Sequence, residues 1–229
     1  MGAPTLTPRP RDKTVRKVLV VDDHEIMRQG LTQLIDQEDD LRVCGEAQDI
    51  PEALAQIQKL SPDVAIIDIS LKDGSGLELI KDIKVRWPEL PVLVLSMHDE
   101  TFYAERALRA GARGYVSKSE VSSKVVKGLR DILQGGLYVG DKIASKLLRG
   151  LVGGTPAKVS PVDRLSDREF EVFGLLGQGL QMREIAARMH LSLKTVEAHR
   201  EHVKKKLNIE SANQLLTYAV QWTQLEHGG

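Results

Sequence analysis

The sequence predicts an α/β part, a doubly wound sheet of five parallel strands covered by helices on both faces, followed by a small all-α domain. Short β-branched runs alternate with segments of helical spacing over residues 17–134, and the strand signal stops after them. The length of 229 residues also suits two domains better than one. We therefore assign residues 1–16 to a disordered tail, 17–134 to the α/β domain, 135–163 to a linker that could carry a short helix, and 164–226 to the helical domain.

Five runs read as strands, and between them apolar residues recur at helical spacing. The first, third and fourth runs are almost uninterrupted apolar stretches, as is typical of central strands in a parallel sheet. The runs are "KVLVV" (17–21), "LRVCGEA" (41–47), "DVAII" (63–67), "PVLVL" (91–95) and "GYVS" (114–117). The expected packed helix faces carry Ile26, Met27, Leu31, Leu34 and Ile35, then Leu54 and Ile57, then Leu79, Ile80 and Ile83, then Val125, Val126, Leu129, Ile132 and Leu133.

The sequence argues against a disulfide-bonded, a secreted or a membrane-spanning protein. With 41% hydrophobic and 28% charged residues, the chain has the composition of an ordinary globular protein. Basic and acidic residues balance at 32 each, so any nucleic-acid-binding surface must be local. Cys44 is the only cysteine, which excludes an intramolecular disulfide. We see neither a secretory signal nor an apolar stretch of about 20 residues, and expect a cytoplasmic protein without a membrane partner.

Polar residues end four of the predicted strands. The first is followed by Asp22 and Asp23, the third by Asp68, the fourth by Ser96, and the fifth runs into Lys118. In an open α/β sheet, ligands bind outside the carboxyl ends of the strands, so these side chains should converge.

Three converging carboxylates repel one another unless a cation joins them, and their hard oxygen atoms suit Mg²⁺. A lysine and a serine hydroxyl at the same place suit a phosphate group. A carboxylate is also a competent nucleophile that forms an aspartyl phosphate. Asp68, on a central strand inside an apolar run, is the best placed acceptor, and this role explains a carboxylate that would otherwise be costly to bury.

The motifs "VLVVDDH", "PDVAIIDIS", "VLVLSMHD" and "GARGYVSK" occur in the order and spacing of the receiver domain of bacterial response regulators, which this region resembles. The resemblance implies a flavodoxin-like fold. It also implies the following roles: Asp68 as phosphoacceptor, assisted by Ser96 and Lys118; Asp22, Asp23, Asp68 and the backbone carbonyl of Ser70 as Mg²⁺ ligands; Ser96 and Tyr115 as switch residues.

Two positions depart from the family pattern. Leu71 and Lys72 stand where Met-Pro is frequent, and Ser119 stands where proline commonly follows the lysine, which removes the usual reason for a cis bond there. Nearby His24 and His98 are interpreted as surface residues rather than metal ligands, because two histidines without a thiolate or matched spacing are weak indicators of a metal site.

The helical domain carries a local basic bias between residues 194 and 206. Five basic residues, Lys194, Arg200, Lys204, Lys205 and Lys206, outnumber Glu197 and Glu201. At helical spacing Val196, Val203 and Leu207 form an opposite, packed face. A short helix, a tight turn and a second helix with one packed and one basic face make a helix-turn-helix unit, whose second helix enters the DNA major groove.

The stretch from Leu165 to about Val220 resembles the LuxR-type DNA-binding domain through "REFEV", "EIAARM", "LSLKTVEAHR" and "KKKLNI". The resemblance implies a recognition helix over residues 194–204 and a last helix, 211–222, that helps form a dimer. The expected DNA contacts are Glu197, Ala198 and Glu201 near the base edges, and Lys194, Thr195, Arg200, Lys204 and Lys206 near phosphates.

Together the two domains are similar to response regulators of the NarL/FixJ type. This predicts a DNA-binding transcription regulator of a two-component system, switched when a partner histidine kinase phosphorylates Asp68, and binding two-fold related DNA as a dimer. We expect no external enzymatic turnover beyond the receiver's own phosphoryl transfer and hydrolysis.

Two alternatives stay open. The first is a regulator that binds DNA regardless of phosphate, with the receiver as a dimerisation or docking module. The second is an aspartyl-phosphate phosphatase, which needs a second aspartate two residues after the nucleophile, where this chain has Ser70.

Overall fold

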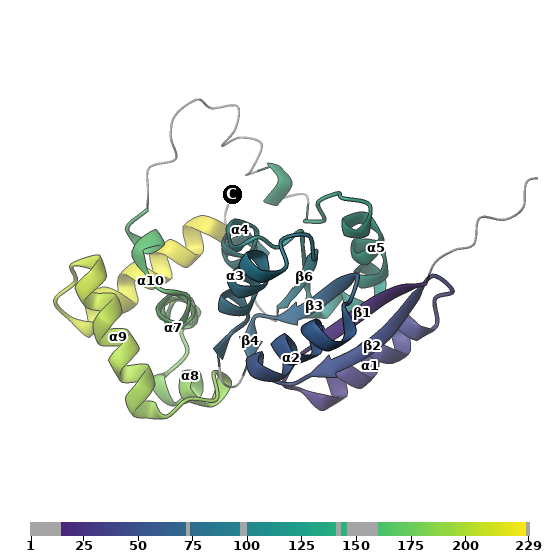
Figure 1. The fold of residues 1–229 in the computed structure, drawn as a ribbon. Helices are drawn as coiled ribbons and strands as arrows, with labels where there is room; N and C mark the ends of the chain where they lie inside the picture. Colours follow the sequence, from purple (N-terminus) through teal and green to yellow (C-terminus); the bar gives the residue numbers. More distant parts are fainter. Residues whose placement is uncertain (1–14, 72–73, 97–99, 141–142, 146–159, 228–229) are drawn as a thin grey trace, which may run out of the picture.

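The computed structural model describes residues 15–71, 74–96, 100–140, 143–145 and 160–227. Its first part is a five-stranded parallel sheet in the order β2-β1-β3-β6-β7, which confirms the predicted fold class (Figure 1). The chain leaves β1 for β2 on one side and returns to β3 on the other, so the strand order reverses between β1 and β3. This is the position where open α/β sheets form their ligand crevice. The strands are β1 (Arg16–Val21), β2 (Leu41–Ala47), β3 (Val64–Asp68), β6 (Val92–Ser96) and β7 (Gly114–Ser117).

Helices cover both faces of this sheet. On one face, Leu31 of α1 and Leu129 of α5 pack in one buried cluster with the sheet. On the other face, α2, α3 and α4 contribute Ile57, Ile80 and Ala107 to a second cluster. The helices are α1 (Glu25–Asp36), α2 (Ile50–Leu60), α3 (Gly76–Arg86), α4 (Glu100–Ala110) and α5 (Val121–Leu133), with a short 3-10 turn, η1 (Lys118–Glu120), before α5.

The prediction that Ile26 belongs to the packed face of α1 is wrong, because its side chain is 87% exposed. Leu31 and Ile35 are buried on that helix, and Ile26 lies about 140° round the axis from Leu31, since each residue turns the helix by about 100°. A small antiparallel ribbon that the sequence did not predict, β4 (Ser70–Leu71) with β5 (Gly74–Ser75), follows the acidic end of β3.

The second part is helical, as expected. It contains η2 (Pro161–Arg164), α7 (Asp167–Gly177), α8 (Met182–Arg188), α9 (Leu193–Leu207) and α10 (Ala212–His227). Serines cap three of these helices by accepting backbone N–H groups: Ser166 from Glu169, Ser192 from Thr195 and Ser211 from Gln214. At α8 the Gln181 side chain makes no cap bond, and the Glu184 carboxylate instead accepts the N–H of Gln181.

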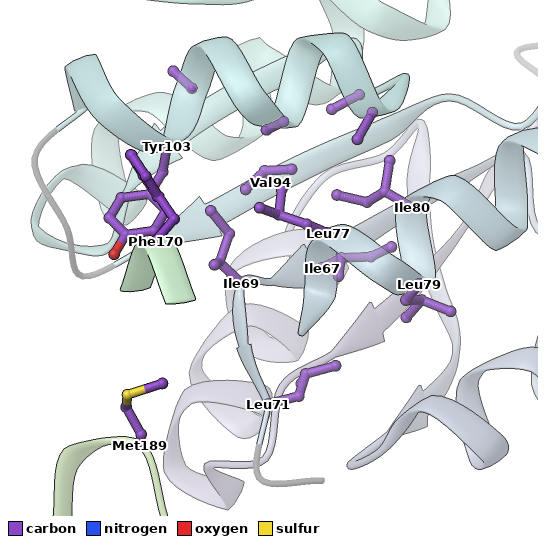
Figure 2. Close-up of a cluster of buried hydrophobic side chains, with 14 of the residues drawn as sticks. Ile67, Ile69, Leu71, Leu77, Leu79, Ile80, Val94, Tyr103, Phe170 and Met189 are labelled. Atoms are coloured by element: carbon purple, nitrogen blue, oxygen red, sulfur yellow. The ribbon is translucent and has the colours of Figure 1, made fainter. Parts of the chain in front are cut away.

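The helical part packs directly against the sheet part, on the side of α3 and α4 (Figure 1). One buried apolar cluster runs through both, and in Figure 2 Phe170 of α7 lies against Tyr103 of α4. These two rings meet edge to face with centroids 5.3 Å apart. Of the predicted linker, residues 143–145 are helical, whereas residues 146–159 and the predicted tail up to residue 14 lie outside the described part.

No helix among the described residues combines the length and apolar composition needed to cross a membrane.

Gly76 lies where α3 begins, tight against the end of β3. A Cβ at this position would collide with the backbone carbonyl of Asp68, whereas a Cβ on Gly30, in the middle of α1, would meet open space. We therefore expect Gly76→Ala to destabilise the protein by about 1–3 kcal/mol or more through overpacking. Gly30→Ala should stabilise it by about 0.5–1 kcal/mol, because alanine is the better helix former. Urea unfolding of both variants checks this pair, and equal midpoints would contradict the close approach at residue 76.

Candidate functional site

The carboxyl ends of β1 and β3 hold a buried ionic cluster. Asp22 and Asp68 are almost fully buried, at 1% and 2% exposure. Lys118, which follows β7 directly, places its Nζ 2.7 Å from Asp22 Oδ2 and 2.8 Å from Asp68 Oδ2. The structure therefore brings together, at the switch point of the sheet, the acidic and basic side chains that the sequence predicted would converge.

Burial and neighbouring charge act on these groups in opposite directions. Burial, opposed by Lys118 and reinforced by Asp22, raises the pKa of Asp68 to about 6. Burial alone would lower the pKa of Lys118, but the adjacent carboxylates of Asp68 and Asp22 raise it. The lysine is thus held in its charged form, where it can neutralise one negative charge of the cluster.

The cluster has the donor set of a hard cation site. The carboxylates of Asp22, Asp23 and Asp68 and the imidazole of His24 bring ligand atoms within 4.8 Å of one another, and the three carboxylates supply the hard oxygen donors. Asp23 Oδ1 is buried and accepts no hydrogen bond from the described residues, although His24 Nδ1 lies 2.9 Å away. Three carboxylates beside a single ammonium leave negative charge uncompensated. Mg²⁺ fits this composition, because it binds carboxylate oxygens and adds positive charge.

Ser70 lies two residues beyond Asp68, at the start of the β4–β5 ribbon. Its backbone N–H donates a hydrogen bond that lowers the pKa of Asp68. Its hydroxyl points the other way and donates to Glu171 Oε1 of α7 at 3.0 Å. Ser70 therefore joins the acidic cluster to the helical domain.

The two predicted switch residues are buried on neighbouring strands. Ser96 ends β6 fully buried, opposite Ser117, the residue before Lys118. Tyr115, 1% exposed, pairs with Val94 and belongs to the apolar cluster that also contains Tyr103 of α4. The Lys118–Ser119 bond is trans, because the described residues contain no cis peptide. Lys72 and His98 lie outside the described residues.

The predicted recognition helix is α9, and its first turns face solvent. Lys194, Thr195, Glu197 and Ala198 are all exposed, whereas Val196 is buried. A helix whose N-terminal residues are open in this way is accessible to a DNA groove.

Farther along α9, several predicted DNA-contacting side chains are engaged with one another. Glu201 accepts from Arg200 Nη2 at 3.3 Å and from Lys204 Nζ at 2.9 Å. Lys206 donates to Glu169 Oε2 of α7 at 2.6 Å, so it helps hold α9 on α7. These pairs lie at or near the surface, where such contacts are weak enough to exchange for phosphate.

Sequence reasoning missed a set of charged residues between the two domains. Arg168 of α7 donates to the backbone carbonyls of Leu71 and Gly74 in the ribbon beyond Asp68. Arg106 of α4 donates to the carbonyls of Leu165 and Val162 at 3.0 and 2.8 Å. No local pattern signals these contacts, since their partners are about 60 to 100 residues away in the chain.

Each of the two parts matches a known protein family. Residues 18–130 match the response regulator receiver domain, and residues 163–219 match the bacterial regulatory proteins of the luxR family. The oxygen regulatory protein NreC of Staphylococcus carnosus is 33% identical over 210 residues, which cover 90% of this chain and 97% of that protein. The chain is a two-component response regulator of the NarL/FixJ type. Receiver domains bind Mg²⁺ at their acidic pocket, and the cluster around Asp68 has that composition.

Further relatives share the same architecture. The DNA-binding transcriptional activator DevR/DosR of Mycobacterium tuberculosis is 36% identical to this response regulator over 205 residues, covering 90% of this chain and 94% of that protein. Among solved structures, RcsB of Salmonella enterica serovar Typhimurium, bound to promoter rprA with the phosphomimetic BeF₃⁻, is 30% identical with a TM-score of 0.58. That match covers 90% of this chain and 99% of the RcsB chain. The homologues are transcription regulators.

We expect Asp23→Asn to weaken Mg²⁺ binding to the response regulator by about tenfold or more, because it removes a charged oxygen from the cation site. Isothermal titration with Mg²⁺ measures this affinity. Glu25→Gln is the matched control, since Glu25 is an exposed carboxylate on the first turn of α1 and hydrogen-bonds Gln29 there. Equal losses in both variants would mean that binding follows total charge rather than this site.

Proposed function

We propose that this response regulator is switched by phosphorylation of Asp68 by a partner histidine kinase, and that the phosphorylated form binds two-fold related DNA sites as a dimer. The observation that carries the proposal is the hydrogen bond from Ser70 to Glu171. It links the segment directly after the acceptor to the first buried helix of the DNA-binding domain. A change at Asp68 thereby has a short physical route to the DNA-binding domain.

The contact between Ser70 and Glu171 is part of a buried network. Glu171 is 2% exposed, and burial raises its pKa, against the lowering influence of Arg168 and of the Ser70 hydroxyl. Arg168 Nη1 lies 2.9 Å from Glu171 Oε2, and its Nη2 donates to the carbonyl of Leu71 at 2.9 Å. Hydrogen bonds to charged groups contribute about 1.5–3 kcal/mol each, so this network stabilises the docked arrangement only while the β4–β5 ribbon keeps its position.

A second set of contacts joins α4 to the start of the helical domain. Arg106 Nη1 lies 3.3 Å from Asp167 Oδ1, and its guanidinium stacks over the Phe170 ring at 3.9 Å from the centroid. Lys81 of α3 adds a 2.8 Å contact to Asp167 Oδ2. The helix that carries the buried Tyr103 therefore also carries the arginine that holds the DNA-binding domain.

Phosphorylation would act on both sets of contacts. Mg²⁺ at the carboxylates would supply positive charge against the incoming phosphoryl group. A carboxylate oxygen of Asp68 would bond to the phosphorus while the bond from phosphorus to the donor histidine nitrogen breaks, and the kinase imidazole would leave. Lys118 would exchange its contact with Asp68 for the new oxygens, and the Ser96 hydroxyl would bond one of them. The ribbon after Asp68 and the buried surface around Tyr115 would then shift, which loosens Glu171, Arg168 and Arg106 together.

A groove beside the acidic cluster supports a protein phosphodonor. It lies between α1 and the start of α5, and its lining includes Met27, Leu34, Lys118 and Val121. Ile26, exposed on the same helix, adds an apolar side chain that the fold leaves unburied. Because Lys118 lines the groove and contacts Asp68, a kinase domain seated there would lie next to the acceptor.

The DNA-binding face supports the second half of the proposal. The exposed first turns of α9 would enter the major groove, and Glu197, Ala198 and Glu201 would approach base edges while Lys194, Thr195, Arg200, Lys204 and Lys206 contact phosphates. On α10, Leu215 and Ala219 are buried against the domain, but Leu216 is 42% exposed. An apolar residue on the outer face of α10 suits contact with a second copy.

We expect Asp68→Asn to abolish phosphorylation-dependent DNA selection, because the amide is not a phosphoryl acceptor. Fragments of the source genome would be selected on purified protein with and without Mg²⁺ and a small phosphodonor. The unmutated chain should enrich a two-fold related site only with the donor. Asp63→Asn is the control, because it changes a carboxylate that pairs with Arg16 at 3.0 Å, away from the acidic cluster. It should give the same enrichment as the unmutated chain. Equal enrichment in all conditions would favour phosphate-independent binding, and no enrichment would exclude the DNA-binding proposal.

We expect Arg106→Ala to raise the DNA affinity of the unphosphorylated protein about fivefold or more, the lower end of typical coupling between sites. The substitution removes the contacts with Val162, Leu165 and Asp167 and leaves the acidic cluster intact. Trp222 packs against Phe170 with ring centroids 5.6 Å apart, so its fluorescence should report the loosened interface. Arg86→Ala, whose contact with Asp82 is exposed, is the control and should change neither signal. Tighter docking or unchanged affinity in Arg106→Ala would contradict release as the mode of control.

A further inference from the structure

Two histidines from different domains face each other beside the acidic cluster. His24 lies at the start of α1, and His190 lies in the turn between α8 and α9 of the helix-turn-helix unit. Their ring centroids are 5.9 Å apart. Between them lies Asp23: His24 Nδ1 is 2.9 Å from Asp23 Oδ1, and His190 Nε2 is 3.7 Å from Asp23 Oδ2.

The side chain of Asp23 is buried to more than nine-tenths, with 8% of its surface exposed. Its Oδ1 accepts no hydrogen bond from the described residues despite the short distance to His24. A buried carboxylate oxygen that accepts no hydrogen bond is unfavourable. A cation would compensate it in either of two ways: as Mg²⁺ among the receiver carboxylates, or as a metal ion held jointly by Asp23 and both imidazole rings.

The three side chains have the composition of a transition-metal site. One ligand atom from each of Asp23, His24 and His190 lies within 4.8 Å of the others. Zinc bonds of roughly 2.0–2.2 Å to nitrogen and oxygen require neighbouring ligand atoms a little over 3 Å apart in a tetrahedron. Both histidine side chains are well exposed, at 58% for His24 and 41% for His190, so their rings can rotate to close the remaining distance. Imidazole nitrogen favours zinc over magnesium, which takes oxygen ligands.

We propose that Asp23, His24 and His190 form a zinc-type divalent metal site that ties the helix-turn-helix turn to the receiver. Three protein ligands leave the fourth position to water. A metal ion bound there stabilises only the docked arrangement of the two domains, because His190 reaches the site only when the domains are packed together. It also takes Asp23 away from the Mg²⁺ cluster, so zinc opposes phosphorylation. This second consequence rests on the proposed function, whereas binding itself does not.

Binding is tested with Co²⁺ and Zn²⁺ on the full chain. Co²⁺ reports nitrogen and carboxylate ligation through its visible absorption, and Zn²⁺ affinity is measured by isothermal titration in millimolar Mg²⁺. His190→Asn is the decisive variant, because residue 190 has a left-handed backbone (φ 53°) that asparagine tolerates. His24→Asn is its counterpart in the receiver. His202→Asn removes a more exposed histidine on α9 and is the matched control.

The unmutated chain and His202→Asn should bind one ion with equal affinity, and His24→Asn and His190→Asn should each bind about tenfold more weakly or worse. Zn²⁺ should raise the unfolding temperature of the unmutated chain and not that of His190→Asn. Unchanged affinity in His190→Asn would overturn the proposal, because the ion would then lie in the receiver alone. Asp68→Asn keeps all three ligands, so a failure of phosphorylation control leaves this result intact, and a failure of zinc binding leaves the phosphorylation proposal untouched.

Discussion

The contact of Lys118 with both Asp22 and Asp68 is the interaction on which the functional end of the sheet depends. Three strands deliver these groups to one place, and each would be unfavourable there alone, because all three side chains are at most 3% exposed. The lysine compensates part of the carboxylate charge, and this allows the central strands to stay apolar up to their last residue. The same compensation is incomplete, and the cluster therefore has the composition to hold a divalent cation.

The arrangement beyond Asp68 extends that constraint into the DNA-binding domain. Ser70 faces two ways: its backbone N–H donates to the Asp68 carboxylate and its hydroxyl donates to Glu171. Coupling between two sites is reciprocal in free energy. If release of α7 follows phosphorylation, then DNA that binds the released domain must favour phosphorylation of Asp68 by the same factor. If such coupling exists, the contacts of Ser70 with Asp68 and with Glu171 are the path that would carry it.

The sequence predicted the sheet, its strand limits within about two residues and the converging groups at the strand ends, because these follow from local periodicity and from the rule that places ligands at carboxyl strand ends. The side of α1 that Ile26 occupies was predicted wrongly, since an apolar residue beside a packed stripe looks like part of it. The contacts of Arg106 and Arg168 could not be predicted, because they depend on how two domains dock. The same reason hides the approach of His24 to His190, which come from different domains and share no spacing pattern.

The first turns of α9 stay exposed when the two domains are docked. Docking therefore does not prevent DNA binding by covering the recognition helix. What docking fixes is the orientation of the helical domain, through Arg106, Arg168 and Glu171. A dimeric helix-turn-helix protein must place its two recognition helices about 34–36 Å apart to meet successive major grooves. Two domains each held on their own receiver are oriented by the receivers, whereas under the proposed function two released domains would be free to pair through α10. We infer that phosphorylation controls DNA binding by freeing this orientation, because the contacts that would change hold the domain without hiding its recognition helix.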